Sequence, residues 1–219
     1  MTKMLKSIIA GAAVLIGACF IGQTQPVQAA DDYALRLAED NQWYYYQDDE
    51  VDTAYQGLAL NEYGWWYVSD GTIDWDYAGM ALNDYGWWYV SNGTVDFNYT
   101  GMALNEYGWW YFNNGVLDLS YTGMALNDYG WWYFNNGQLD LTFYGLANNE
   151  YGTWFYTNGQ LNFGFTGMLI PDDRWLYVRN GQVLTDYTGM AVNDYGWWYF
   201  KDGAIDFVYT GMAVNEYGW

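Results

Sequence analysis

The side chains that could do chemistry in this sequence are aromatic rings and carboxylates. Its 219 residues include 15 Trp, 25 Tyr, 10 Phe and 26 acidic residues, but only six basic residues and no histidine. Without histidine, and with Cys19 as the single cysteine, the sequence cannot build a Ser/His/Asp triad, a Cys/His pair or a histidine-ligated metal site. Only paired carboxylates could carry catalysis, whereas a line of rings could stack on a flat ligand.

The rings and carboxylates recur with a fixed spacing, because most of the chain consists of copies of one segment. The copy at residues 101–122 reads GMALNEYGWWYFNNGVLDLSYT, and the first glycines of successive copies are 22 residues apart. These glycines are Gly57, Gly79, Gly101, Gly123, Gly145, Gly167, Gly189 and Gly211. A period of about 20–50 residues predicts a solenoid, in which each copy buries its apolar face against its neighbours.

Each copy is predicted to contain a β-hairpin. Residues 109–112 favour a strand, Asn114-Gly115 is a strong hairpin-turn signal, and residues 116–119 supply a return strand. The segment from Gly101 to Gly108 is interpreted as a connector that carries a second turn. Because one unit buries too little surface to fold alone, the predicted fold class is all-β, a solenoid of stacked β-hairpins built from 22-residue aromatic repeats.

Alternation along the predicted strand divides its side chains between two faces. The first Trp and the Tyr of each Trp-Trp-Tyr run share one face, and the second Trp shares the other face with the residue after the Tyr. In four copies that residue is Val68, Val90, Phe112 or Phe134. This second face is predicted to be the interior because it is apolar, whereas the first face carries a hydroxyl that needs a polar partner or water.

The repeats divide the chain into four predicted regions. Residues 1–29 are interpreted as a signal peptide, residues 30–56 as a degenerate N-terminal capping repeat, residues 57–210 as seven 22-residue repeats, and residues 211–219 as a partial C-terminal repeat. Two copies depart most from the pattern, because Thr153 replaces a first Trp and Leu176 replaces a second Trp. Loss of these rings predicts that residues 145–188 are the least stable part of the array.

The first 29 residues have the parts of a secretory signal, with two lysines, an apolar run over residues 8–21, and a cleavage-like segment that ends at Ala29. The protein is therefore expected to be secreted or held at the cell surface, with no membrane span. The alternative is a lipoprotein signal that leaves a lipid on Cys19. After cleavage, four basic and 26 acidic residues would remain, a net charge of about −22 that disfavours nucleic acid and anionic membranes as partners.

The pattern G-x-x-x-N-x-x-G-x-W-Y-x-x-N-G, recurring after a signal peptide, is similar to the cell-wall-binding repeats of Gram-positive surface proteins. That family includes choline-binding and glucan-binding repeats, and the resemblance covers about residues 35–219. It implies hairpins stacked as a left-handed solenoid, with ligands held between consecutive hairpins by Trp, Tyr and an apolar residue. It also implies that the partner is a bacterial cell-wall polymer or another polysaccharide, and no cofactor is expected.

The resemblance implies that the second Trp and the Tyr of each run bind the ligand. The first Trp forms a line of rings on which an extended sugar chain could stack, although these rings could equally pack against the connector of the next copy. The candidate ligand-binding residues are therefore Trp65, Trp66, Tyr67, Trp87, Trp88, Tyr89, Trp109, Trp110, Tyr111, Trp131, Trp132, Tyr133, Trp197, Trp198 and Tyr199.

The sequence departs from choline-type repeats at the residue after the first glycine. Choline-type repeats have a Trp there, whereas this sequence has Leu or Met, and its connector turn is one residue longer. The residues at this position are Leu58, Met80, Met102, Met124, Leu146, Met168, Met190 and Met212. One wall of a choline cage is therefore missing, and these residues are interpreted as core fillers.

Carboxylates also recur in every copy, for example Glu106 in the connector turn and Asp118 on the predicted return strand. Stacked carboxylates could bind Ca²⁺, but no known calcium-loop spacing is present, so they are interpreted as a solvated face with no metal site. A glycosidase pair is disfavoured because repetition makes no copy special. The favoured function is an exported, non-catalytic module that binds cell-wall polymer or another polysaccharide. The alternatives are a structural or adhesive surface protein, and true binding of choline on teichoic acid.

Overall fold

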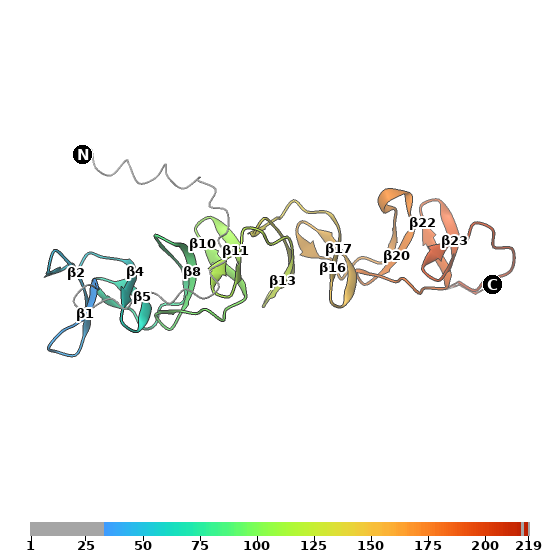
Figure 1. The fold of residues 1–219 in the computed structure, drawn as a ribbon. Coiled ribbons are helices and arrows are strands. Elements are labelled where there is room, and N and C mark those ends of the chain that lie inside the picture. Colours follow the sequence, from blue (N-terminus) through green and yellow to red (C-terminus); the bar gives the residue numbers. More distant parts are fainter. Residues whose placement is uncertain (1–32, 216, 219) are drawn as a thin grey trace, which may run out of the picture.

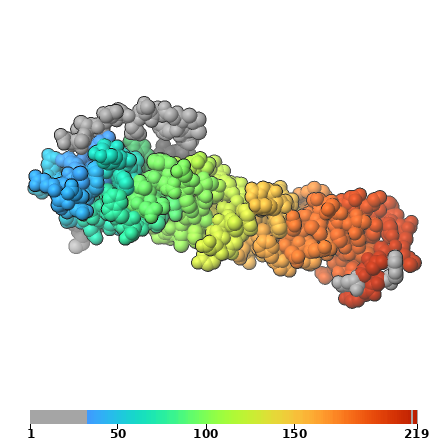
Figure 2. Space-filling view, turned by 90° about the horizontal axis from the view of Figure 1, so that it is seen from below, coloured from blue at the N-terminus to red at the C-terminus, as the bar shows by residue number. Residues whose placement is uncertain are grey.

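The computed structural model describes residues 33–215, 217 and 218 and shows an elongated array of strands (Figure 1). The described residues contain 24 strands and one short 3₁₀ helix. Repeats follow one another along the long axis in chain order, from the N-terminal to the C-terminal end (Figure 2). The predicted all-β repeat fold is therefore confirmed. The predicted signal peptide, with Cys19, lies outside the described residues.

The strands fall into groups of three that repeat along the chain. The first groups are β1 (Leu35–Leu37), β2 (Trp43–Gln47), β3 (Glu50–Val51); β4 (Gly57–Asn61), β5 (Gly64–Ser69), β6 (Thr72–Ile73); β7 (Gly79–Asn83), β8 (Gly86–Ser91), β9 (Thr94–Val95); and β10 (Gly101–Asn105), β11 (Gly108–Asn113), β12 (Val116–Leu117). The later groups are β13 (Gly123–Asn127), β14 (Gly130–Asn135), β15 (Gln138–Leu139); β16 (Gly145–Asn149), β17 (Gly152–Thr157), β18 (Gln160–Leu161); β19 (Gly167–Leu169), η2 (Pro171–Asp173), β20 (Leu176–Arg179), β21 (Gln182–Val183); and β22 (Gly189–Asn193), β23 (Gly196–Lys201), β24 (Ala204–Ile205).

Each complete repeat contains three strands. The prediction of a two-stranded hairpin with a connector therefore missed one strand. All five residues of β10 pair with β11, from Gly101 opposite Phe112 to Asn105 opposite Gly108, whereas β11 and β12 share only two pairs. The predicted connector is therefore a strand, and it forms the longer hairpin of the repeat. Its three middle residues are Met, Ala and Leu, which have weak strand preference, so only pairing with the aromatic strand reveals it.

Neighbouring repeats are joined by backbone hydrogen bonds. Tyr111 N–H donates to the Gly137 carbonyl of the next repeat over 2.8 Å, and Gly137 N–H donates back to the Tyr121 carbonyl over 2.8 Å. Trp110 in β11 also pairs with Gln138 in β15. Equivalent bridges recur from β2 to β21, so that β1 to β21 form one continuous 21-stranded sheet.

The apolar core is divided into clusters that lie between consecutive repeats. In the cluster between the repeats that start at Gly101 and Gly123, Phe134 is fully buried with Met102 and Ala125. Trp109 and Tyr111 of the earlier repeat pack against the same cluster. A repeat therefore completes the core of its neighbour, as expected for an array whose units do not fold alone.

The predicted division of each strand into an inner and an outer face is half right. Val68, Val90, Phe112 and Phe134 are 0% exposed, which confirms that they point inward. The opposite face was expected to point outward, and this is wrong, because Tyr111 and its equivalents pack into the cluster shared with the next repeat. The physical reason is that the repeats stack face to face, so both faces of each strand are covered.

Within the part of the chain that the structure describes, the array is interrupted between the repeats that start at Gly167 and Gly189. Here β22, β23 and β24 form a separate three-stranded sheet. Among the described residues, no hydrogen bond joins Tyr177 N–H to the Gly203 carbonyl, although its equivalent is present at the earlier junctions. Leu184 occupies the position where other copies have an Asp or Asn that caps the loop with its side chain. The interruption therefore coincides with the loss of a cap that holds the loop for the next repeat.

The connector turn before this junction is also altered, because Pro171 opens the 3₁₀ helix η2 where other copies have an Asn-x-Tyr-Gly turn. The strand before it, β19, has three residues where the other complete repeats have five. The repeat that starts at Gly145 keeps its bridge to the following repeat, through Trp154 and Gln182. The missing rings predict that residues 145–188 are the least stable part of the array. Within this region, the loss of backbone hydrogen bonding between repeats is confined to one junction.

We predict that hydrogen exchange opens the array first at this junction. The amide of Tyr177 should exchange faster than that of Tyr133, whose N–H donates to the Gly159 carbonyl over 2.8 Å. Leu184→Asp should slow exchange at Tyr177 by restoring the side-chain cap. Amide exchange followed by mass spectrometry of the intact chain measures both effects. Equal protection of Tyr177 and Tyr133 would count against the prediction.

Candidate ligand-binding site

The second Trp of each run is held by the connector turn of its own repeat. Trp110 Nε1 donates to Asn105 Oδ1 over 3.0 Å, and the same oxygen accepts the N–H of Tyr107 over 2.9 Å. The arrangement recurs in the repeats that start at Gly57, Gly79, Gly123, Gly145 and Gly189. Because its polar atom is satisfied inside the repeat, the second Trp has a structural role in holding the turn.

The Tyr of each run is also engaged inside the array. Tyr89 stacks on Tyr99 with ring centroids 3.4 Å apart, and the Tyr99 hydroxyl donates to the Met102 carbonyl over 2.6 Å. Burial is the main cause that raises the pKa of Tyr99 to about 12. The same cause raises the pKa of Tyr55, Tyr77 and Tyr121 to about 12. The second Trp and the Tyr are therefore part of the framework, and the first Trp shares in it by packing against the clusters between repeats.

At four junctions, the first Trp of a run lies beside the connector turn of the following repeat. We use the name niche for this first Trp together with the Tyr of the following turn, as in Trp65 with Tyr85. The two rings meet edge to face, with centroids 6.0–6.4 Å apart at four junctions. These four pairs are Trp43 with Tyr63, Trp65 with Tyr85, Trp131 with Tyr151, and Trp197 with Tyr217.

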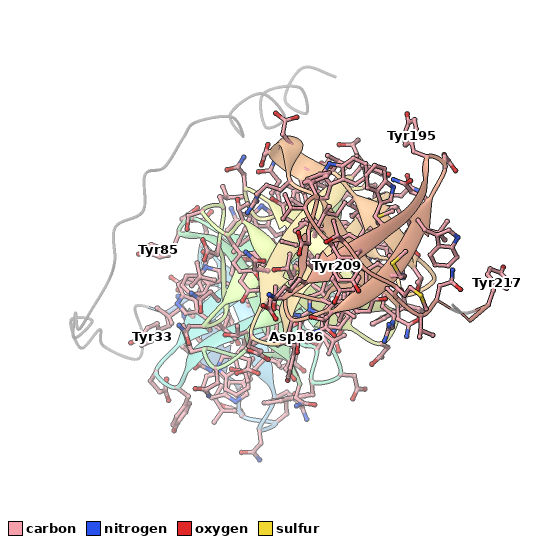
Figure 3. The ribbon with its side chains drawn as sticks, turned by 90° about the vertical axis from the view of Figure 1, so that its right-hand side faces the viewer. Tyr33, Tyr85, Asp186, Tyr195, Tyr209 and Tyr217 are labelled. Carbon is pink, nitrogen blue, oxygen red and sulfur yellow. The ribbon has the colours of Figure 1, made fainter. Side chains whose placement is uncertain are left out.

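The turn tyrosines are the most exposed rings of the niches, with exposed fractions of 64–84%. They are Tyr63, Tyr85, Tyr107, Tyr129, Tyr151, Tyr195 and Tyr217. Seen along the long axis, Tyr85, Tyr195 and Tyr217 project away from the strands on different sides of the array (Figure 3). The row of niches therefore winds around the long axis.

A shallow hollow of about 290 Å³ accompanies one niche. It is lined by Tyr55, Leu58, Trp65, Leu82, Asn83 and Asp84, which come from three consecutive repeats. Leu82 is 53% exposed, and the Asp84 carboxylate is the charged group of the lining. The hollow thus combines an aromatic wall, an aliphatic side chain, an amide and a carboxylate. This mixture can stack on a sugar ring or attract a cation.

Both rings of a niche are absent at the same junction, between the repeats that start at Gly145 and Gly167. The first Trp is replaced by Thr153, and the turn Tyr is replaced by Asp173, 20 residues further along the chain. The fully buried core residue of the later repeat is retained there as Val178. This junction therefore keeps the buried core residue while it lacks both rings of the niche.

The residue after the first glycine is buried in the central repeats, although Leu58 also contributes to the lining of the hollow beside Trp65. Leu58, Met80, Met102 and Met124 are only 4–8% exposed and belong to the clusters between repeats. Their interpretation as core fillers is confirmed for these four positions. The ring that choline-type repeats have at this position is thus replaced by a side chain that serves the core.

The recurring Asp after the return strand has a local structural role. Asp118 Oδ1 accepts the N–H of Ser120 over 2.9 Å, and the same bond forms at Asp52, Asp74, Asp96, Asp140 and Asp206. Hydrogen bonds from the side chain and the N–H of Thr142 lower the pKa of Asp140. Within residues 33–215, 217 and 218, no three Asp, Glu, His or Cys side chains gather as metal ligands would.

The sequence analysis missed the turn tyrosines as candidate binding residues. Their signal was present, since a Tyr recurs in the Asn-x-Tyr-Gly turn at the 22-residue period. The turn was interpreted only as a chain reversal, because Asn and Gly explain its geometry by themselves. Only the stacking of repeats shows that a turn Tyr meets the first Trp of the preceding copy, as it does at four junctions.

The family model described as a choline-binding repeat matches six segments of the chain. They are residues 54–74, 76–96, 98–118, 120–140, 142–162 and 186–206. Together these segments cover more than half of the chain, so the protein belongs to the choline-binding repeat family. Membership of this family supports a cell-wall-binding role. No curated protein matches the chain.

Solved structures similar to the chain include an alternansucrase in complex with isomaltononaose, at 14% identity and a TM-score of 0.31; the match covers 84% of this chain and 14% of that chain. Choline-binding protein F from Streptococcus pneumoniae matches at 17% identity and a TM-score of 0.29, covering 75% of this chain and 63% of that one. The Cpl-1 endolysin, complexed with a peptidoglycan analogue, matches at 18% identity and a TM-score of 0.26, covering 60% and 41%. The chain thus spans less than two thirds of each of these proteins.

No helix in the part of the chain that the structure describes is both long enough and apolar enough to cross a bilayer.

We predict that high pH destabilises the array through its buried tyrosines. Their folded-state pKa of about 12 exceeds the ordinary value of 10.0, so folding favours the neutral hydroxyl. This stabilisation is complete below pH 10, the ordinary pKa, and is lost as the pH rises through about 12. Urea unfolding across this pH range, with tyrosinate absorbance recorded in parallel, measures the loss.

Tyr99→Phe provides the matched variant, because Phe143 and Phe165 occupy the same position in two other repeats. The variant should be less stable than the original at neutral pH, since it loses the hydrogen bond to the Met102 carbonyl. The difference should shrink above pH 10, where the original tyrosine begins to ionise on unfolding. A stability difference that is constant with pH would contradict the assignment.

Proposed function

We propose that the chain is an exported, non-catalytic module that binds a cell-wall polysaccharide in the niches between its repeats. The observation that carries the proposal is the recurring pair of a first Trp and an exposed turn Tyr, with both rings lost together at one junction. A polysaccharide presents flat apolar sugar faces at regular intervals. Many weak contacts of this kind along one polymer give strong retention through avidity.

The geometry of the niche favours a polysaccharide over choline. The two rings are already in edge-to-face contact with each other, so they do not enclose a space between them. Met80, which stands where a choline-type repeat has a further ring, is buried in the core. The niche therefore offers a one-sided aromatic wall. A sugar face needs only such a wall with a few hydrogen-bonding groups, whereas a quaternary ammonium group is bound best by rings on several sides.

One observation favours choline as the second candidate. The carboxylate of Asp84 lines the hollow together with Trp65 and Tyr55. A carboxylate beside aromatic rings attracts a cation, and other connector turns carry an acid at the same place, for example Glu106 and Asp128. The high negative charge of the chain would favour binding of the choline cation but would repel the phosphates of teichoic acid.

A sedimentation assay distinguishes these functions. The full chain without residues 1–29 is mixed with purified Gram-positive cell wall, with wall stripped of teichoic acid, and with insoluble glucan. We expect retention on at least one stripped wall or glucan, with no release by millimolar choline. Release by choline would support the choline alternative, and absence of retention on every glycan would support the structural or adhesive alternative.

The niche is tested by combining Trp65→Ala, Trp87→Ala and Trp131→Ala. Retention should fall by about tenfold or more, because each lost ring contact is worth on the order of 1 kcal/mol. Thr153→Ala is the matched control, since it lies at the same strand position in the junction that lacks both rings. It should leave retention unchanged. The proposed site would be wrong if the triple variant stayed folded and were retained as strongly as the control.

A further inference from the structure

A second row of exposed apolar side chains follows the capped loops of the repeats. It consists of Trp75, Phe97, Leu119, Leu141, Phe163 and Phe207, which are 52–70% exposed. We use the name platform for these residues. They belong to neither the niches nor the buried cores of the clusters between repeats.

Each aromatic platform residue contacts the second Trp of its own repeat. Trp75 meets Trp66 with ring centroids 5.1 Å apart, and Phe97 meets Trp88 at 5.7 Å. Phe163 and Phe207 meet their Trp partners at 5.8 and 6.1 Å. All four pairs are edge-to-face contacts. The platforms are therefore held in place from one side while most of their surface remains exposed.

A hollow of about 280 Å³ lies at Phe97. It is lined by Ser91, Asn92, Thr94, Val95, Asp96, Phe97 and Asn98. This hollow shares no residue with the hollow of the niche at Trp65. Its loop is fixed, because Asp96 N–H donates to the Tyr89 carbonyl over 3.0 Å and Asp96 Oδ1 accepts Asn98 N–H over 2.9 Å. An exposed ring in a fixed setting of amides and hydroxyls is thus available to a ligand.

We propose that this hollow is a second binding site, separate from the niche, and that it takes a neutral pyranose unit of a polysaccharide stacked on Phe97. The inference rests on the proposed function, since it assigns a second contact to the same class of polymer. No basic side chain lines the hollow, which disfavours an anionic ligand. Its one carboxylate, on Asp96, already caps the loop, while the side chains of Asn92, Asn98 and Thr94 offer neutral donors and acceptors for sugar hydroxyls.

The platform residue is aromatic in some repeats and aliphatic in others, so that the two kinds can be compared within one chain. Trp75, Phe97, Phe163 and Phe207 are rings that can stack on a sugar, whereas Leu119 and Leu141 offer no flat face. The ability of a platform to stack on a sugar therefore differs between repeats, and the two aliphatic platforms belong to the repeats that start at Gly101 and Gly123. The first Trp of the niche is present in both of those repeats, so the two rows vary independently.

The test compares two double variants of the full chain without residues 1–29. Trp75→Ala with Phe97→Ala removes two aromatic platforms, and Leu119→Ala with Leu141→Ala is the matched control at the same positions. Retention on the glycan that retains the unmodified chain should fall several-fold for the first pair and remain unchanged for the second. Leu119→Trp should raise retention, and this gain keeps the test decisive if the first pair fails to fold.

The outcomes separate this inference from the proposed function. The inference is overturned, and the proposed function survives, if the niche variants lose retention while the platform variants and Leu119→Trp change nothing. Equal losses from both double variants would also overturn it, because an aliphatic platform cannot stack on a sugar. If the unmodified chain is retained on no glycan, the proposed function and this inference both fail.

Discussion

The close approach of each Asn-Gly turn to the preceding repeat is the constraint on which the rest of the structure depends. A Cβ atom on Gly93 would lie 2.5 Å from the Asp74 carbonyl oxygen and 3.0 Å from Trp75 Cα, so only glycine fits. Gly93 also accepts a hydrogen bond from Tyr67 N–H and donates one to the Tyr77 carbonyl. The contact fixes the distance between repeats, and the 22-residue period follows from placing one such turn against each preceding loop.

Face-to-face stacking determines which side chains remain available to a ligand. The clusters between repeats take both faces of each strand, including the hairpin Tyr and the residue after the first glycine. The turn tyrosines of the niches and the platforms of the capped loops remain exposed, together with Leu82, Leu104 and Leu126 of the connector strands. These positions tolerate loss without loss of the fold, since Asp173 stands at a turn Tyr position and Leu119 at a platform position. Any ligand specificity of the array can therefore vary from one repeat to the next.

The sequence was sufficient to predict the repeat period, the all-β fold and the burial of Phe112 and Phe134, because these follow from spacing and alternation. It was insufficient where a role depends on the neighbouring repeat. The sequence of Met102 to Leu104 does not indicate a strand, which is recognised only by its pairing with β11. Tyr85 is likewise recognised as a site residue only by its contact with Trp65. The interruption after β21 was likewise hidden, because Leu184 looks like an ordinary apolar residue in the sequence.

Equilibrium urea unfolding of Gly93→Ala against Gly86→Ala tests the central claim most directly. Both glycines have positive φ, of 73° and 127°, but a Cβ on Gly86 would meet nothing within 4 Å. If the turn contact couples the repeats, Gly93→Ala should split unfolding into two transitions, because the array divides at that junction. Gly86→Ala should lower stability through backbone strain and keep one transition. A single transition for both variants with the same midpoint would contradict the account.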